Sequence, residues 1–335
     1  MKPLKFLKPL SYVYLLFFNI SQLIRKAKQK KLNCRVISVG NITVGGTGKT
    51  PMVIYLAELL AKRNTCVVSR GYKSKIISKN PIVVSDGKRI FVGPKISGDE
   101  AYLVARSLKG IPVVIGKDRY KAGLFSIEKF GVDTIILDDG FQHLGLYRNI
   151  DLVCINALNP FGDFLLLPAG YLREPVNGLS RADIILITRC DKVSDEKILE
   201  IENTIKIYNK NAHIFHAYFK KDIFDRNRNK VDLKKLHEKN IIAISGIAVP
   251  EDFEKTIKEL ELNLLFHRKY PDHYFFKDKD IRRFYSDAAE FQAVVITTAK
   301  DVTRLPEDFP CYVLDVRLEI KEKDELTNHL EKKLG

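Results

Sequence analysis

Short apolar runs recur along the chain, and stretches with apolar residues at helical spacing separate many of them. The runs are rich in β-branched residues, and most are continuous rather than alternating, as in strands that are covered on both faces. They lie at 35–39, 65–69, 112–115, 134–137, 151–155, 183–188, 241–245, 293–297 and 312–316. This pattern predicts a doubly wound, mostly parallel α/β sheet.

A glycine-rich segment follows the first run and reads Val-Gly-Asn-Ile-Thr-Val-Gly-Gly-Thr-Gly-Lys-Thr-Pro from 39 to 51. Pro51 suits the first turn of a helix, whose apolar positions then recur at helical spacing. Glycines let successive backbone N–H groups converge on a polyphosphate, and the helix N-terminus adds its positive dipole end. Thr43 stands where the strict phosphate-loop motif has glycine, but flexibility comes from inside the loop. The segment predicts a P-loop NTPase fold.

The phosphate-loop motif predicts the roles of individual residues. Lys49 would reach the terminal phosphates of the nucleotide, and the Thr50 hydroxyl would ligate Mg²⁺. The remaining residues of the predicted nucleotide-binding loop are Gly45, Gly46, Thr47 and Gly48.

The run 134–137 ends in two carboxylates, Asp138 and Asp139, followed by Gly140. In a phosphate-loop protein, an acid at the end of a nearby strand holds Mg²⁺ directly or through water. A strand that ends in Asp-Gly is also an ordinary turn, so the metal assignment depends on the neighbouring loop. Spacing does not tell which carboxylate contributes more.

Two further segments supply candidates for acid–base chemistry. Ser97 and Glu100 have the spacing of a capping box at a helix start. Asp99 between them either complements the helix dipole or acts as a general base that accepts a proton from an alcohol. Asp272-His273 gives an acid–imidazole pair in a later loop, either structural or directed at the phosphates across a cleft between domains.

Arginines follow several predicted strands, where anionic groups tend to be received. Arg119 follows the run 112–115. Arg173 and Glu174 lie in a loop between Pro168 and Pro175, where Arg173 either binds a phosphate or pairs with Glu174.

The formal charge of +15 is uneven. Nine Lys or Arg residues and no acid lie in 1–35. A nucleic-acid-binding protein more often has its charge across a folded face, together with recognition motifs that are missing from this sequence. We therefore expect no nucleic-acid partner.

Residues 10–24, between the two basic clusters, are strongly apolar. As a helix they would rise about 22 Å, short of the roughly 30 Å hydrocarbon core of a bilayer. We expect a helix that lies in the membrane interface, held by apolar burial and by attraction to anionic lipids. The alternative is a first helix packed on the domain, with a solvated basic tail.

The length of 335 residues allows two domains. We expect an N-terminal membrane-associating helix at 1–32, a P-loop domain at 33–215, a polar linker or hairpin at 216–238, and a smaller α/β domain at 239–335. The five scattered cysteines lack C-x-x-C spacing, which indicates reduced, mostly buried thiols in a cytosolic protein.

The ordered set of motifs resembles the tetraacyldisaccharide 4′-kinase family over nearly the whole chain. It comprises the N-terminal hydrophobic-basic segment and the segments 40–51, 69–72, 98–100, 118–119, 137–143, 167–175, 245–250, 272–273 and 297–305. The resemblance implies a membrane-associated kinase on a P-loop fold, with a second α/β domain that closes over the nucleotide. It implies transfer of the γ-phosphate of ATP, with Mg²⁺, to the 4′-hydroxyl of an acylated disaccharide 1-phosphate.

The same resemblance assigns residues by matching motif. Lys49 and Thr50 would bind phosphate and Mg²⁺, and Asp138 and Asp139 would serve the metal site. Gln142 and His143 would lie around that site. Asp99 would be the base, assisted by His273. The implied location is the cytoplasmic face of the bacterial inner membrane, without an obligate protein partner.

Three positions depart from the family pattern. Ala101 stands where proline is expected, Tyr274 where a second histidine is expected, and Ala299 where an acid is expected. These changes leave the implied base and metal ligands in place and put in doubt only a supporting role for the three positions.

Two other classes of P-loop protein are alternatives. A membrane-associated switch ATPase has a Lys-Gly-Gly-x-Gly-Lys-Thr loop, but Val44 replaces its first lysine and the membrane segment lies at the wrong terminus. A GTP-dependent metallochaperone is disfavoured because no Cys/His cluster accompanies the loop.

Overall fold

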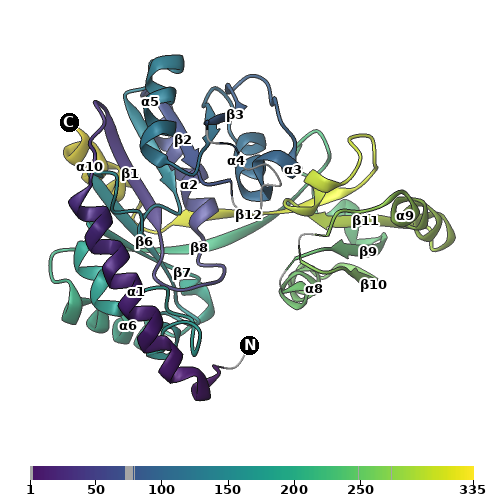
Figure 1. The fold of residues 1–335 in the computed structure, drawn as a ribbon. Helices are drawn as coiled ribbons and strands as arrows, with labels where there is room; N and C mark the ends of the chain where they lie inside the picture. Colours follow the sequence, from purple (N-terminus) through teal and green to yellow (C-terminus); the bar gives the residue numbers. More distant parts are fainter. Residues whose placement is uncertain (1–2, 72–77, 79, 248, 273) are drawn as a thin grey trace. The chain divides into compact units, whose positions relative to one another are not determined.

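The computed structural model describes residues 3–71, 78, 80–247, 249–272 and 274–335, which divide into two compact units. Unit 1 comprises residues 3–219 and 318–335 of the described chain, and unit 2 comprises 220–317. Figure 1 shows the ribbon with its labels. The strands are β1 (Arg35–Gly40), β2 (Thr65–Ser69), β3 (Ile82–Ser85), β4 (Val113–Ile115), β5 (Thr134–Asp138), β6 (Ile150–Asn156), β7 (Ile184–Thr188), β8 (His213–Phe224), β9 (Asn240–Ser245), β10 (Asn263–Lys269), β11 (Ala293–Thr298) and β12 (Tyr312–Ile320).

The α-helices are α1 (Lys8–Ala27), α2 (Lys49–Leu59), α3 (Pro94–Ser97), α4 (Asp99–Ser107), α5 (Arg119–Phe130), α6 (Asp195–Tyr208), α7 (Lys234–His237), α8 (Pro250–Glu259), α9 (Asp278–Glu290) and α10 (Lys323–Leu334). Short 3₁₀ helices lie at Lys5–Leu7, Gly162–Phe164, Val176–Arg181, Cys190–Lys192 and Asp301–Arg304. Among the described helices, none is both long enough and apolar enough to cross a membrane.

The strands of unit 1 follow the order β8-β7-β6-β1-β5-β2-β4-β3. Neighbours from β8 to β4 are parallel, and β3 pairs antiparallel with β4. The predicted doubly wound, mostly parallel sheet is thereby confirmed. Val39 lies opposite Asp138 in the β1–β5 ladder, so the phosphate loop and the carboxylate pair leave adjacent strands at the same edge.

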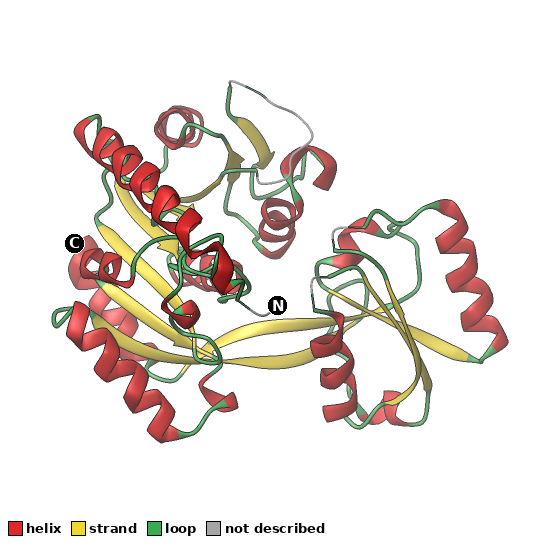
Figure 2. Cartoon of the chain, turned by 60° about the horizontal axis from the view of Figure 1, so that its bottom comes forward, coloured by secondary structure: helices red, strands yellow, loops and turns green. Residues whose placement is uncertain are grey.

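Helices cover both faces of the unit 1 sheet (Figure 2). On β1, Ile37 faces a core that also holds Leu56 of α2, Val104 of α4 and Leu330 of α10. Val36 faces the opposite core, with Ala122 of α5. Burial on both faces explains why these strands are continuously apolar rather than alternating.

The strands β10, β9, β11 and β12 follow one another in that order in unit 2, and neighbouring strands are parallel. Ala243 of β9 faces a core shared with Phe253 of α8, and Ile244 faces a core shared with Phe284 of α9. The smaller unit therefore has its own two-sided core.

The domain limits differ from the predicted ones at two places. The segment 318–335 belongs to unit 1 rather than to the second domain, because Leu326, Leu330 and Leu334 of α10 pack into a unit 1 core. The predicted linker 216–238 contains most of β8 and α7, and the chain passes between the units within β8 and β12.

The predicted runs correspond to β1, β2, β4, β5, β6, β7, β9, β11 and β12, whereas β3, β8 and β10 were missed. Strand β8 mixes exposed, half-buried and buried positions, whereas β10 has only exposed and half-buried positions and ends in charged residues. Partial burial leaves no continuous apolar run, which is why the pattern did not reveal these strands.

Candidate active site

The loop between β1 and α2 is braced from both sides. The Asn41 Nδ2 donates to the Thr43 carbonyl oxygen at 2.6 Å and contacts the Thr47 Oγ1 at 3.0 Å. The Thr188 hydroxyl at the end of β7 donates to the Thr47 carbonyl oxygen at 3.1 Å. These bonds fix the loop backbone before any phosphate is bound.

Gly48 forms the start of α2 in the left-handed region, with φ 88° and no side-chain cap. The first-turn N–H groups of α2 are therefore not capped by a side chain there, which is the arrangement of an anion site. Gly45 also has a positive φ, 110°, and a Cβ at Gly45 or Gly46 would meet nothing within 4 Å. Open space over these two glycines leaves room for phosphate oxygens.

Asp138, the last residue of β5, is 2% exposed. The Ser69 hydroxyl of β2 donates to its Oδ2 at 3.0 Å. Its Oδ1 is buried without a hydrogen-bond partner in the described chain. Burial, with the charges of Glu100 and Asp139, raises the pKa of Asp138 to about 6. The residue thus presents one unsatisfied carboxylate oxygen.

Asp139 follows with a positive φ of 56° and a different set of partners. Arg173 contacts it with both ends of its guanidinium, Nη1–Oδ1 at 2.6 Å and Nη2–Oδ2 at 2.9 Å. The Lys49 Nζ lies 3.6 Å from Oδ1. Burial alone would raise the pKa of Asp139, but the Arg173 hydrogen bonds and the Lys49 charge lower it to about 2. Asp139 is therefore an ion-pair residue.

A polar network extends from this ion pair. The Arg173 Nη1 also contacts Asn41 Oδ1 at 3.0 Å and Gln142 Oε1 at 3.3 Å. The Gln142 Nε2 donates to the Asn41 carbonyl oxygen at 2.6 Å and to the buried Glu174 at 2.8 Å. Glu174 in turn pairs with Arg181 at 2.6 Å. Arg173 forms its ion pair with Asp139 rather than with Glu174, and its predicted binding to a phosphate stays a prediction.

Arg119 lies close enough to Asp138 and Asp139 for their charges to affect its pKa, and the charge of Arg119 in turn affects the pKa of His143. Arg119 is 4% exposed and donates to the Gly116 carbonyl oxygen at 2.9 Å. Burial lowers its pKa to about 10, and the charge of Asp138 opposes that shift. Burial, then the charge of Arg119, lowers the pKa of His143 to about 4, so its imidazole is neutral at neutral pH.

Asp99 is the first residue of α4 and is 5% exposed. The predicted capping box is wrong, because Gly98 caps α4 with φ 79° and no side chain caps it. The Ser97 hydroxyl donates instead to the carbonyl oxygens of Gly93 and Gly98. The charge of the neighbouring Glu100 helps to raise the pKa of Asp138. His273 lies outside the described residues.

Helix α1 turns its polar side chains towards the loops of this site. The Tyr14 hydroxyl donates to the Arg173 carbonyl oxygen at 2.5 Å, and the Gln22 Nε2 donates to the Gln142 carbonyl oxygen at 3.1 Å. The opposite face is apolar and exposed, comprising Leu10, Tyr12, Val13, Leu16, Phe17, Ile20, Leu23 and Ile24. The helix is therefore amphipathic with its apolar face outward.

The structure brings together Lys49, Asp139, Gln142, Arg173 and Glu174, which were predicted separately. Sequence reasoning gave no role to Asn41, Ser69 or Thr188, although each follows or ends an apolar run, where site residues gather in such sheets.

Comparisons with known proteins agree over nearly the whole chain. The sequence profile of the family described as tetraacyldisaccharide-1-P 4′-kinase matches residues 4–335. The tetraacyldisaccharide 4′-kinase of Halothermothrix orenii is 38% identical over 330 residues, covering 91% of this chain and 85% of the relative. That of Aquifex aeolicus is 34% identical over 323 residues, covering 96% of each. A crystal structure of LpxK from Aquifex aeolicus in complex with ATP matches with a TM-score of 0.81 and 31% identity, covering 98% of both chains.

Proposed function

The chain belongs to the tetraacyldisaccharide-1-P 4′-kinase family, and we propose how its own residues perform that family's reaction. The enzyme transfers the γ-phosphate of ATP to the 4′-hydroxyl of a tetraacyldisaccharide 1-phosphate in lipid A biosynthesis. An alcohol that attacks a phosphoryl group needs positioning, a proton acceptor and neutralisation of charge on the phosphate oxygens.

One observation supports the assignment best: Lys49 of the phosphate loop and Arg173 converge on Asp139 at the end of β5. Asp139 thereby holds two cationic side chains beside the glycines of the phosphate loop. Lys49 would move to the β- and γ-phosphates of ATP, while Arg173 keeps Asp139 ionised and oriented. Asn41, through its bonds to Thr43 and Thr47, would hold the loop in its phosphate-binding form.

We assign a magnesium site to Thr50 and Asp138. The unsatisfied Oδ1 of Asp138 is a buried carboxylate oxygen of the type that Mg²⁺ prefers. No three His, Cys, Asp or Glu side chains of the described chain cluster as metal ligands. This fits an ion that binds through one or two carboxylates and otherwise through substrate phosphates and water. When bound, Mg²⁺ would neutralise charge on those phosphates.

Asp99 is assigned as the general base. Its carboxylate is buried at the start of α4, beside Gly98, and the family resemblance places a base at this motif. It would accept the proton of the 4′-hydroxyl as the oxygen attacks the γ-phosphate. His273 would assist it by the same resemblance.

The outward apolar face of α1 supports docking at a membrane surface. Leu16, Phe17 and Leu23 are 59%, 67% and 69% exposed, which suits insertion at the headgroup level. Arg25 and Lys26 in the last turn would attract anionic lipids. A lipid acceptor leaves a bilayer reluctantly, at about 0.8 kcal/mol per buried methylene, so the enzyme must work at the surface. We place it at the cytoplasmic face of the inner membrane.

Phosphate transfer tests this proposal directly. Purified protein in detergent micelles receives γ-labelled ATP, Mg²⁺ and a tetraacyl disaccharide 1-phosphate, and the products are separated by thin-layer chromatography. Label should move to the lipid, and both Lys49→Ala and chelation of Mg²⁺ should abolish the transfer. Hydrolysis of ATP with an accessible but unlabelled lipid would favour the switch-ATPase alternative.

A further inference from the structure

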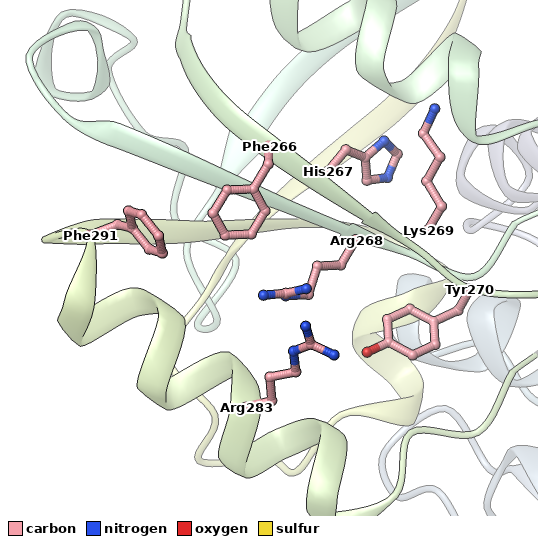
Figure 3. A pocket seen from close by; sticks show the side chains of 7 residues that line it. All are labelled: Phe266, His267, Arg268, Lys269, Tyr270, Arg283 and Phe291. Atoms are coloured by element: carbon pink, nitrogen blue, oxygen red, sulfur yellow. The ribbon is translucent and has the colours of Figure 1, made fainter.

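Unit 2 contains a cavity of about 570 Å³ between β10 and α9, within the size range of small-molecule sites. Figure 3 shows Phe266, Arg268 and Tyr270 directed towards α9, which contributes Arg283. His267 and Lys269 also line the cavity, with side chains on the opposite side of the strand. Phe291, just after α9, completes the set. We call this cavity the β10–α9 pocket, and none of its lining residues belongs to the phosphate loop.

Aromatic rings form part of its wall. Phe266 and Phe291 meet edge to face, with ring centroids 5.3 Å apart and an interplanar angle of 76°. Tyr270 packs edge-on against Phe284 and Phe276 at 5.9 Å and 5.3 Å. Rings held by neighbouring rings keep a fixed orientation, so they offer a planar ligand a preformed surface.

The charge of the pocket is unbalanced. Arg268 pairs with the buried Asp287 through Nε–Oδ2 and through Nη2–Oδ1 at 2.7 Å. Its guanidinium carbon lies 4.9 Å from the Phe266 ring centroid. Arg283 is exposed, and no ion pair to it occurs within the described residues. Asp287 therefore neutralises Arg268, and the charge of Arg283 is left without a carboxylate partner among the described residues.

Tyr270 adds a donor at the same place. Burial and the charge of Asp280 raise the pKa of its hydroxyl, while Arg268 and Arg283 act in the opposite direction. The hydroxyl therefore stays protonated at neutral pH. Both arginines are close enough to Tyr270 to influence its charge, which places the three groups around one volume.

We propose that the β10–α9 pocket binds a phosphate monoester on an aromatic body, with the phosphate at Arg283 and Arg268 and the ring against Phe266 and Phe291. Guanidinium groups match phosphate oxygens with two parallel N–H donors, and aromatic faces accept a flat ring. The phosphate of the ligand supplies the anionic partner that Arg283 lacks among the described residues. The ligand comes either from solution or from a phosphate headgroup at a membrane.

Calorimetric titration of the full chain with phenyl phosphate tests the site, with Arg283→Gln as the variant. Arg282→Gln is the matched control, because Arg282 is the exposed neighbour on α9 that does not line the pocket. Affinity should fall roughly tenfold in Arg283→Gln and stay unchanged in Arg282→Gln. Lys49→Ala should also leave it unchanged. Equal affinity in both arginine variants, or loss of binding in Lys49→Ala, would overturn the proposal.

Two further experiments identify the chemical class and the source of the ligand. Phe266→Leu should reduce the preference for phenyl phosphate over inorganic phosphate; an unchanged preference would refute the aromatic part of the site. Vesicles with one-fifth phosphatidic acid distinguish the sources. Weaker vesicle binding in Arg283→Gln than in Arg282→Gln would support the site with a lipid headgroup as the source. Equal vesicle binding, with the phenyl phosphate difference intact, would support it with a soluble ester.

Discussion

Arg173 and Asp139 are joined by two parallel hydrogen bonds, of 2.6 Å and 2.9 Å, between a loop and the end of β5. Arg173 also accepts a hydrogen bond from Tyr14 of α1 through its carbonyl oxygen. One residue therefore links the exposed apolar helix, the phosphate loop and the carboxylate pair. A change at Arg173 should affect catalysis through the position of Asp139 rather than through the stability of the fold.

Replacing Arg173 with lysine should lower kcat/KM by roughly 10- to 100-fold. Lysine keeps the charge but lacks the planar fork that holds both oxygens of Asp139, and hydrogen bonds between charged groups contribute about 1.5–3 kcal/mol. Steady-state transfer assays measure the change. Tyr14→Phe is the control, since it removes only the bond to the Arg173 carbonyl. Activity of Arg173→Lys within threefold of the unchanged enzyme would refute the positioning role.

Alanine at Gly48 and alanine at Gly46 should behave differently. A Cβ at Gly48 would lie 3.0 Å from the Phe219 ring and 3.2 Å from Thr188, on a backbone with φ +88°. We expect Gly48→Ala to lower the melting temperature and to abolish ATP binding, because both the contact and the backbone are strained. Gly46→Ala has open space and should leave the melting temperature unchanged. If Gly46→Ala nevertheless binds ATP more weakly, the added methyl group must interfere with the bound phosphates, since it disturbs nothing in the fold.

Asp138→Asn should separate catalysis from stability. The buried carboxylate has one unsatisfied oxygen, and its pKa of about 6 lies above the ordinary 3.8. The free-energy cost of this raised pKa is absent below pH 3.8, grows as the pH rises towards 6, and is fully present above pH 6. At pH 8 with chelator, the melting temperature of the variant should be equal or higher. Its transfer activity with Mg²⁺ should fall at least about 100-fold. A lower melting temperature with full activity would contradict the magnesium assignment.

The end of β5 shows what the sequence could and could not predict. The apolar run that ends in Asp138-Asp139 predicted the pair and its edge of the sheet. The two carboxylates differ in role because Ser69 of β2 contacts Asp138, whereas Arg173, 34 residues after Asp139, contacts Asp139. Since the pattern did not set the order of strands, it could not assign those partners.

For helices α1 and α10, the sequence likewise predicted a helix or its buried face but not the residues against which it packs. The apolar segment near the N-terminus predicted a helix, but the contacts of Tyr14 and Gln22 that turn its polar face inward join residues more than a hundred positions apart. The spacing of Leu326, Leu330 and Leu334 shows that α10 has a buried face. It does not show which core receives that face, so the C-terminal segment was assigned to the wrong unit.

Asp99→Asn should keep ATP affinity within about twofold and lower kcat by about 10²–10⁴-fold, the usual contribution of a positioned base. The amide is similar in size to the carboxylate but cannot accept a proton. Nucleotide titration and single-turnover transfer measure the two properties separately. Lys109→Gln is the control, because Lys109 is exposed just after α4. Near-normal turnover in Asp99→Asn would remove Asp99 as the base.

The apolar face of α1 should determine membrane recovery without affecting the nucleotide site. Leu16→Ser with Phe17→Ser removes two exposed apolar side chains, each worth about 1.5–3 kcal/mol when fully buried. Partial insertion should still weaken binding to anionic vesicles by roughly 10- to 100-fold. Leu199→Ser with Ile207→Ser is the matched control, because these residues are 56% and 76% exposed on α6. Vesicle flotation and nucleotide titration measure both effects. If the α1 and α6 variants float equally well, the apolar face of α1 is not the membrane contact.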